Sequence, residues 1–180
     1  MPSIQKIKNK KGASLIYRLR NEKFLFVLAG AGAEDYKKSI EIMKSLSRKG
    51  SNLAINLVNK LSIIEILVFI KHYVDILVGC DSSLGHIAAL FGKTTLSIFG
   101  PTDPVVVAPY SNSSFVIDHP LPCAPCYLTK DFYGCRSNDC MNSISFETIA
   151  LLILEKIGSE QRVYPDSRSG DRVKKMQFFV

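Results

Sequence analysis

The sequence has no long uninterrupted apolar run. A membrane-spanning helix needs roughly 18 or more consecutive apolar residues, whereas the most apolar stretch, Leu61 to Ile70, is short and contains Glu65. The N-terminus also lacks the pattern of a secretory signal peptide, which is a basic segment followed by an apolar core and a small-residue cleavage site. These absences predict a cytoplasmic protein.

The middle of the chain has no excess of positive charge, although the net charge of the whole chain is +7. Residues 1–23 carry 7 basic and 1 acidic side chains, residues 159–180 carry 5 and 3, and residues 24–158 carry 11 and 12. A nucleic-acid groove needs a basic stripe on the folded part of a protein, so nucleic acid is excluded as a partner. Basic ends suit solvated termini or peripheral contact with an anionic surface such as the inner membrane.

The length of 180 residues and the hydrophobic fraction of 47% fit one ordinary globular domain. We expect a basic, weakly structured lead-in over residues 1–23, a folded domain over residues 24–158 and a polar tail over residues 159–180. Within that tail only residues 176–180 are apolar enough to dock on the domain.

Candidate strands alternate with candidate helices from residue 24 onward. Runs typical of buried strands stand at 24–28, 53–57, 75–80, 94–99 and 115–117. Helical spacing predicts helices at 34–48, 62–70, 84–91 and 146–157, and Ser62 with Glu65 forms a capping box. This alternation predicts a Rossmann-like three-layer α/β domain with a parallel sheet and right-handed crossovers.

Three loops rich in small residues, 30–33, 80–83 and 100–103, follow predicted strands. Ligands of open α/β sheets bind outside the carboxyl ends of the strands. The second loop leads into a helix, whose free N–H groups and dipole favour an anion. Its two serine hydroxyls add donors, and the glycine in the first helical turn allows close approach of a ligand or of a neighbouring chain segment. A diphosphate fits this arrangement.

Each of these residues also has a structural interpretation. Asp or Ser before a helix is usually only an N-cap, and a single histidine such as His86 is more often a hydrogen-bonded interior residue than a ligand contact. Thr102 and Asp103 either contact a ligand or cap a tight turn between two prolines. His72 and His119 match no ligand pattern, and we expect them to be structural or exposed.

Several segments resemble one family of enzymes. Residues 81–92 (DSSLGHIAALFG) and 96–104 (LSIFGPTDP) look like the signature of the ADP-heptose:lipopolysaccharide heptosyltransferases, glycosyltransferase family 9. Residues 56–65, the glycine-rich loop at 30–34 and the cysteine-bearing loop at 123–141 are similar to further stretches of that family. The resemblance covers about residues 24 to 157.

The resemblance implies a GT-B fold in which this chain is the C-terminal, donor-binding half. It implies inverting transfer from ADP-heptose or a similar nucleotide sugar to the lipopolysaccharide core, without a metal or other cofactor. The implied donor-binding residues are Glu34, Asp81, Ser82, Ser83, Leu84, Gly85, His86 and Thr102. Because like charges repel, Asp81 is assigned to sugar hydroxyls or to ordering the loop rather than to the phosphates.

The sequence departs from the family pattern in two ways. Ser83 stands where the family usually has glycine, and a serine is strained there if the position needs a positive φ. Only 23 residues precede the first predicted strand, so we expect this chain to lack the acceptor domain that would hold the general base, and we assign no catalytic residue. We expect the chain to bind a nucleotide sugar without transferring it. The alternative is a non-catalytic nucleotide- or sugar-binding module, or a relic, that pairs with another chain.

Four of the five cysteines, Cys123, Cys126, Cys135 and Cys140, have the spacing C-x2-C-x8-C-x4-C. This spacing is compatible with a structural zinc site. Reduced thiols packed in a loop are the expected state in the cytoplasm, and donor binding in the family needs no metal, so we predict none. Cys80 ends a predicted strand, and we expect it in the core rather than as a nucleophile.

Overall fold

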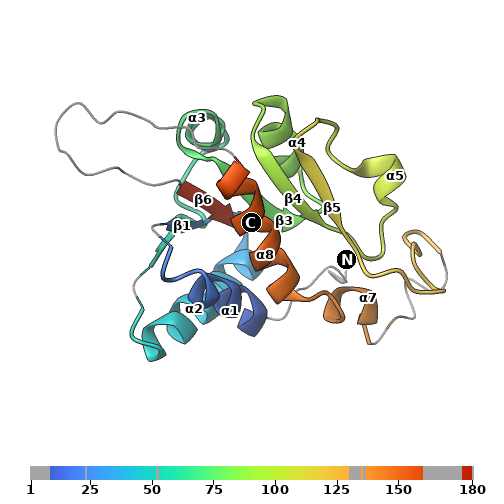
Figure 1. The fold of residues 1–180 in the computed structure, drawn as a ribbon, viewed down its shortest axis with the longest axis horizontal. Coiled ribbons are helices and arrows are strands. Elements are labelled where there is room, and N and C mark those ends of the chain that lie inside the picture. Colours follow the sequence, from blue (N-terminus) through green and yellow to red (C-terminus); the bar gives the residue numbers. More distant parts are fainter. Residues whose placement is uncertain are drawn as a thin grey trace.

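A parallel sheet forms the middle layer of the computed structural model (Figure 1). The structure describes residues 9–22, 24–51, 53–129, 135, 137–159 and 176–179. Its strands are β1 (Leu25–Leu28), β2 (Ala54–Asn56), β3 (Ile76–Cys80), β4 (Thr94–Ile98), β5 (Ser114–Ile117) and β6 (Met176–Phe179). Within these described residues they form one six-stranded sheet in the order β2-β1-β6-β3-β4-β5. Every pairing is parallel, which confirms the predicted α/β fold.

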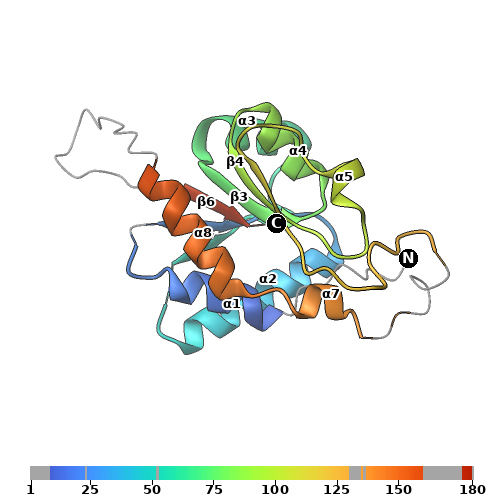
Figure 2. The same ribbon diagram turned by 45° about the vertical axis from the view of Figure 1, so that its right-hand side comes forward.

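Helices cover both faces of the sheet, as Figure 2 shows. One face carries α1 (Asn9–Arg18), α2 (Ala33–Arg48) and α8 (Phe146–Ser159), and the other carries α3 (Ile63–Tyr73) and α4 (Ser83–Leu90). Two short helices, α5 (Pro104–Val107) and α7 (Asp139–Asn142), lie in the loops that follow β4 and β5. None of the helices in the described part of the chain is long and apolar enough to cross a membrane.

Successive residues of a strand contribute to opposite layers of the core. Phe26 and Leu28 of β1 pack in the cluster under α1, α2 and α8, whereas Val27 between them packs under α3 and α4. In β3, Val78 packs in the cluster under α1, α2 and α8, whereas Leu77 packs under α3 and α4. This alternation follows from the two-residue period of a strand. Because both layers are apolar, the central strands read as continuous apolar runs in the sequence.

The capping box predicted before α3 is present. The Ser62 hydroxyl accepts a hydrogen bond from the Glu65 N–H, with 3.4 Å between the two heavy atoms, and the Glu65 carboxylate accepts one from the Ser62 N–H at 2.8 Å. The Ser62 hydroxyl also donates to the Glu65 carboxylate at 2.7 Å. This hydrogen bond first, and the one from the Ser62 N–H second, lower the pKa of Glu65. The box fixes where α3 starts and therefore where the chain turns after β2.

The expectation of a weakly structured lead-in is wrong for residues 9–18, which form α1. Leu15 and Ile16 of α1, and Leu19 directly after it, are at most 1% exposed in the core. The lysines and arginine of this segment dominate its composition, but the spacing of the three apolar residues is that of a helix that buries one face.

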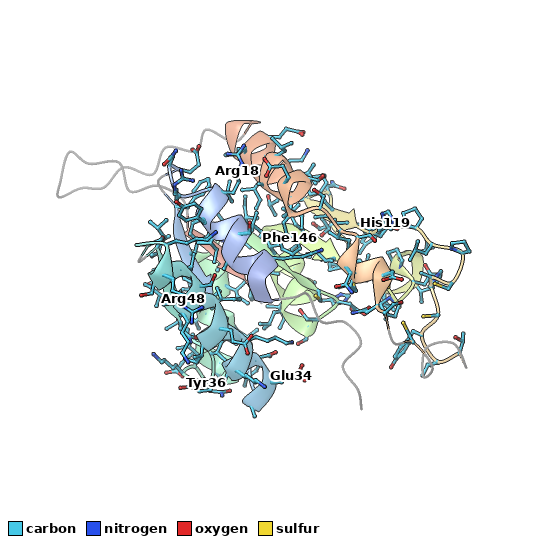
Figure 3. The ribbon with its side chains drawn as sticks, turned by 90° about the horizontal axis from the view of Figure 1, so that it is seen from below. Arg18, Glu34, Tyr36, Arg48, His119 and Phe146 are labelled. Carbon is cyan, nitrogen blue, oxygen red and sulfur yellow. The ribbon has the colours of Figure 1, made fainter. Side chains whose placement is uncertain are left out.

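Two basic side chains of the lead-in join α1 to the start of α8 and to the segment just before it. Arg18 pairs with Glu147 at 2.8 Å, and Figure 3 shows it beside α8. The Lys11 ammonium donates to the carbonyls of Asn142 and Ile144, where α7 ends and the chain turns toward α8. The sequence suggested that the basic side chains of this segment were solvated. Arg18 and Lys11 instead hold α1 in the outer layer.

The apolar end of the predicted tail is a central strand. Residues 176–179 form β6, which pairs with β1 on one side and β3 on the other, and Phe179 lies between Leu28 and Val78 in the register. Residues 160–175 and Val180 lie outside the described residues. Helix α1 and strand β6 fall outside the limits 24–158 predicted for the domain, but both belong to the same three layers.

The order in which strands are added to the sheet changes direction after β2. From β1 the chain passes through α2 to the edge strand β2, and it then returns through α3, on the opposite face, to β3. In open α/β sheets ligands usually bind outside the carboxyl ends of the strands at which this change occurs. Here these strands are β1 and β3, and β6 lies between them. The loops after β1 and β3 therefore define the candidate site.

Candidate functional site

The turn between β3 and α4, together with the first turn of α4, carries most of the predicted site residues. Ser82 is the N-cap of α4 in an extended conformation (φ −157°, ψ 156°), but its side chain does not cap the helix. Its hydroxyl oxygen is buried and has no hydrogen-bond partner among the described residues. Because an unpartnered buried hydroxyl costs about 1–3 kcal/mol, this orientation is unfavourable unless a ligand or a water molecule supplies the partner.

Ser83 occupies the first position of α4 without strain. The non-glycine residues with positive φ in the described part of the chain are Asn59, Leu128 and Asn138, so Ser83 does not need the conformation that favours glycine. Its side chain is exposed, as is that of His86 on the same helix. Both side chains are accessible to a ligand. His86 is therefore not a hydrogen-bonded interior residue, which was the structural alternative for it.

Two other residues in the first turn of α4 have packing roles. Leu84 is 9% exposed and belongs to the cluster under α3 and α4. A Cβ on the buried Gly85 would lie 3.4 Å from Pro109 Cγ and 3.6 Å from Ser97 Oγ. The absence of a side chain at Gly85 therefore lets α4 approach the next strand and loop. Of the two roles expected for this glycine, close approach of a ligand or of a neighbouring chain segment, the structure shows the second.

The loop after β1 needs glycine for a steric reason. A Cβ on Gly30, which has a φ of 153°, would lie 2.8 Å from Asp35 Oδ2. The same carboxylate accepts a hydrogen bond from the Ala31 N–H at 3.3 Å. Asp35 in the first turn of α2 thus folds back over the end of β1.

Asn59, which sequence reasoning did not select, holds this loop from the other side. Its Oδ1 accepts a hydrogen bond from the Gly32 N–H at 2.7 Å, and its Nδ2 donates to the Gly32 carbonyl at 3.3 Å. Its own N–H donates to the Gly30 carbonyl at 3.1 Å. With a φ of 61°, Asn59 has a conformation that asparagine tolerates better than most residues.

We expect Asn59→Ala to destabilise the protein more than Asn59→Gly. Both changes remove the two side-chain hydrogen bonds to Gly32, which contribute about 0.5–1.5 kcal/mol each. Alanine also has to adopt a left-handed conformation, which costs about 1–2 kcal/mol more than in glycine. Urea unfolding of the two variants measures the difference, and equal stabilities would contradict the conformational part of the argument.

Charged side chains gather where α2 begins. Glu34 lies at this end of α2 and Arg48 at the other (Figure 3). The Lys38 ammonium lies 3.6 Å from a carboxylate oxygen of Glu34 and 3.6 Å from one of Asp35. Sequence reasoning selected Glu34 but not Lys38. Its spacing from Glu34 is visible in the sequence, but its place beside these strand ends depends on the order of the strands.

The thiol of Cys80 links this charged group to β3. Burial raises the pKa of Cys80 to about 11, with Lys38 lowering it and the carboxylates of Asp81 and Asp35 raising it further. The thiol is therefore protonated at neutral pH and is a poor nucleophile. The charges that act on it come from both α2 and the residue after β3, so the two strand ends share one electrostatic environment.

In the loop after β4, Asp103 acts as a cap. Its carboxylate accepts a hydrogen bond from the Val105 N–H at 2.9 Å, and Pro104 occupies the first position of α5. Thr102 is 7% exposed. The capping alternative therefore holds for Asp103, and Thr102 lies within the loop rather than on its surface.

The cysteines are free thiols. Cys126 and Cys140 are buried, whereas Cys123 and Cys135 are exposed. Burial is the main cause that raises the pKa of Cys140, and the other three thiols of the loop raise it further. No three Cys, His, Asp or Glu side chains within the described residues are arranged to hold a metal ion. His72 and His119 are exposed, as expected.

Residues 9–136 match the model of glycosyltransferase family 9 (heptosyltransferase). A segment of 49 residues is 45% identical to lipopolysaccharide heptosyltransferase 1 of Pseudomonas aeruginosa, and it covers 27% of this chain and 14% of that protein.

The fold is similar to that of two solved E. coli enzymes. For ADP-heptose lps heptosyltransferase II the TM-score is 0.63 at 21% identity, over 85% of this chain and 43% of that one. For heptosyltransferase WaaC, solved with ADP, the TM-score is 0.65 at 15% identity, over 86% and 41%. The chain thus spans less than half the length of these enzymes, and their GT-B heptosyltransferase fold matches the predicted class.

Proposed function

Because the chain belongs to glycosyltransferase family 9, the heptosyltransferases, we propose that it binds the nucleotide-sugar donor of a heptosyl transfer. The proposed site lies outside the carboxyl ends of β1 and β3. One observation carries the proposal, namely the buried Ser82 hydroxyl that lacks a partner among the described residues at the start of α4. The WaaC structures that share the fold were solved with ADP and with an ADP-heptose analogue, which supports an adenine nucleotide as the ligand.

In this proposal the diphosphate lies at the N-terminus of α4, where unpaired backbone N–H groups and the helix dipole favour an anion. Ser82 and Ser83 donate to phosphate oxygens, and His86 faces the sugar. Asp81 binds sugar hydroxyls or orders the loop, and Glu34 approaches the adenosine. Leu84, Gly85 and Thr102 shape the site from within the protein. Donors to the phosphates stabilise the charge that grows on the departing ADP.

Transfer to the lipopolysaccharide core and a position at the cytoplasmic face of the inner membrane belong to the proposed role of the whole protein. Titration calorimetry with ADP, UDP and GDP tests donor binding directly. A preference for ADP supports the proposal, and the absence of binding to all three would contradict it.

We expect Ser82→Ala to weaken ADP binding without lowering stability. A hydrogen bond to a charged acceptor contributes about 1.5–3 kcal/mol, so the dissociation constant for ADP rises roughly tenfold or more. The melting temperature stays the same or rises, because the variant removes a buried hydroxyl that no described residue satisfies. Calorimetry and thermal unfolding measure the two quantities.

The chain offers a matched control for this experiment. The Ser51 hydroxyl is also buried and without a partner among the described residues. Ser51 precedes the edge strand β2, so it lies at the amino ends of the strands and away from the proposed site. Ser51→Ala removes the same group and leaves ADP binding unchanged. If both variants bind ADP like the unmodified protein, the Ser82 hydroxyl does not contact the ligand.

A further inference from the structure

Around the carboxyl ends of β1 and β3, the strands on either side of β6, the residues described so far carry more negative than positive charge. Glu34 and Asp35 stand at the start of α2, and Asp81 follows β3. A nucleoside diphosphate is itself an anion, and three carboxylates repel it. Backbone N–H groups and serine hydroxyls offset only part of this repulsion, so a diphosphate at this position needs a cation nearby.

Lys38 is a cation that the structure holds among these carboxylates. Its ammonium lies 3.6 Å from oxygens of both Glu34 and Asp35. These separations are longer than the 2.7–3.2 Å typical of a hydrogen bond from nitrogen to oxygen. An ammonium group has three donors, and neither of these two contacts uses one. The two carboxylates therefore position the ammonium and leave its donors available.

Lys38 is related to the ends of both strands, by a contact on the β1 side and by its charge on the β3 side. Asp35 lies against Gly30 and accepts the Ala31 N–H, so the carboxylate beside Lys38 is anchored at the end of β1. The charge of Lys38 also acts on the thiol of Cys80, the last residue of β3. The Lys38 side chain is 31% exposed, which leaves it partly accessible to a ligand.

We propose that Lys38 binds the diphosphate of the nucleotide sugar, with Glu34 and Asp35 holding its ammonium at these strand ends until the ligand arrives. This inference rests on the proposed donor site. It adds a charge-bearing contact from α2 to the contacts at the start of α4, so that the diphosphate is held from both sides of the site. As ADP departs, the same ammonium stabilises its increasing negative charge.

The test compares ADP with adenosine, which lacks the phosphates, by titration calorimetry at low salt. For Lys38→Met we expect the affinity for ADP to fall about 10- to 100-fold, as for loss of a hydrogen bond to a charged group, with adenosine affinity nearly unchanged. The matched control is Lys37→Met, because the neighbouring Lys37 is exposed and is on the same helix. Lys38→Arg keeps the charge and retains most of the ADP affinity.

The outcomes separate this inference from the proposed function. If the unmodified protein binds ADP and Lys38→Met binds it as Lys37→Met does, the inference is wrong and the donor site stands. Equal losses of ADP and adenosine affinity in Lys38→Met would assign Lys38 a structural role and overturn the phosphate contact. If the unmodified protein does not bind ADP, both proposals fail. Weakening of the Lys38 effect by added salt supports a charge-dependent contact.

Discussion

We expect Gly100→Ala to destabilise the protein by about 1–3 kcal/mol, the usual cost of inserting a carbon into a packed core. A Cβ at Gly100 would lie 2.6 Å from Met141 Sδ and 2.9 Å from Cys140 Sγ. Met141 is 1% exposed, so its side chain is packed within the core. Urea unfolding measures the loss.

The steric cause is tested by a double-mutant cycle with Met141→Ala. The single Met141→Ala change costs about 2–5 kcal/mol, because it leaves a cavity in the core. The methyl group of Gly100→Ala then has space, so the double variant is more stable than the sum of the single losses predicts, by about 0.5–3 kcal/mol. Additive losses would show that Met141 is not the cause. Gly12→Ala is a milder control, because a Cβ there would be 3.2 Å from the terminal methyl of Ile42.

Gly100 begins the loop after β4, which contains the predicted site residue Thr102, so the packing around Gly100 affects the position of that loop. The Pro101 carbonyl accepts hydrogen bonds from the N–H groups of Cys126 and Tyr127, at 2.9 and 2.8 Å. The cysteine-bearing segment is thus attached to the loop after β4, and Cys140 and Met141 of α7 lie against its glycine. The cysteines contribute here as packed side chains, and Gly100 is small because they occupy the space beside it.

The sequence predicted the sheet well because both faces of its central strands are buried. Such strands are continuous apolar runs, and their order along the chain, together with right-handed crossovers, predicts which loops meet at the carboxyl edge. The Gly30 and Asp81 loops could therefore be assigned to one edge from the order of the apolar runs alone. The capping box at Ser62 could be predicted because its two partners are only three residues apart.

Contacts between distant residues were beyond the reach of the sequence pattern. Asn59 holds a loop 27 residues earlier in the chain. Its left-handed backbone conformation, which is seen only in the structure, is the feature that distinguishes it. The proximity of Lys38 to Cys80 depends on how α2 lies over the sheet. The unpaired state of the Ser82 hydroxyl is also a property of its surroundings, since the same serine would cap α4 if its side chain were rotated.

The two ends of the chain were harder to predict, for different physical reasons. In α1 the basic residues concealed an apolar helical face that includes Leu15 and Ile16 and continues to Leu19, the residue after the helix. Strand β6 has only four residues and follows a long polar segment, so it has too few residues to show a period. Its place is decided by the hydrogen-bonding edges of β1 and β3 that face each other across it.

We expect Gln177→Pro to disrupt the middle of the sheet. In the register Gln177 lies between Phe26 of β1 and Ile76 of β3. Proline removes the N–H of this residue and is excluded from central strands. The lost hydrogen bond alone costs about 1–3 kcal/mol when its buried partner stays unpaired, and the proline ring adds strain. Gln177→Val is the matched control, because valine keeps the N–H and favours a strand.

Hydrogen–deuterium exchange locates the effect and calorimetry connects it to the site. In Gln177→Pro the amides of β1 and β3 exchange faster than in Gln177→Val, since β6 is the strand that pairs with both of them. ADP affinity falls together with this protection, because the loops after β1 and β3 keep their spacing only while β6 joins the two strands. If the proline and valine variants show the same exchange and the same ADP affinity, then β6 neither joins the two parts of the sheet nor supports the site.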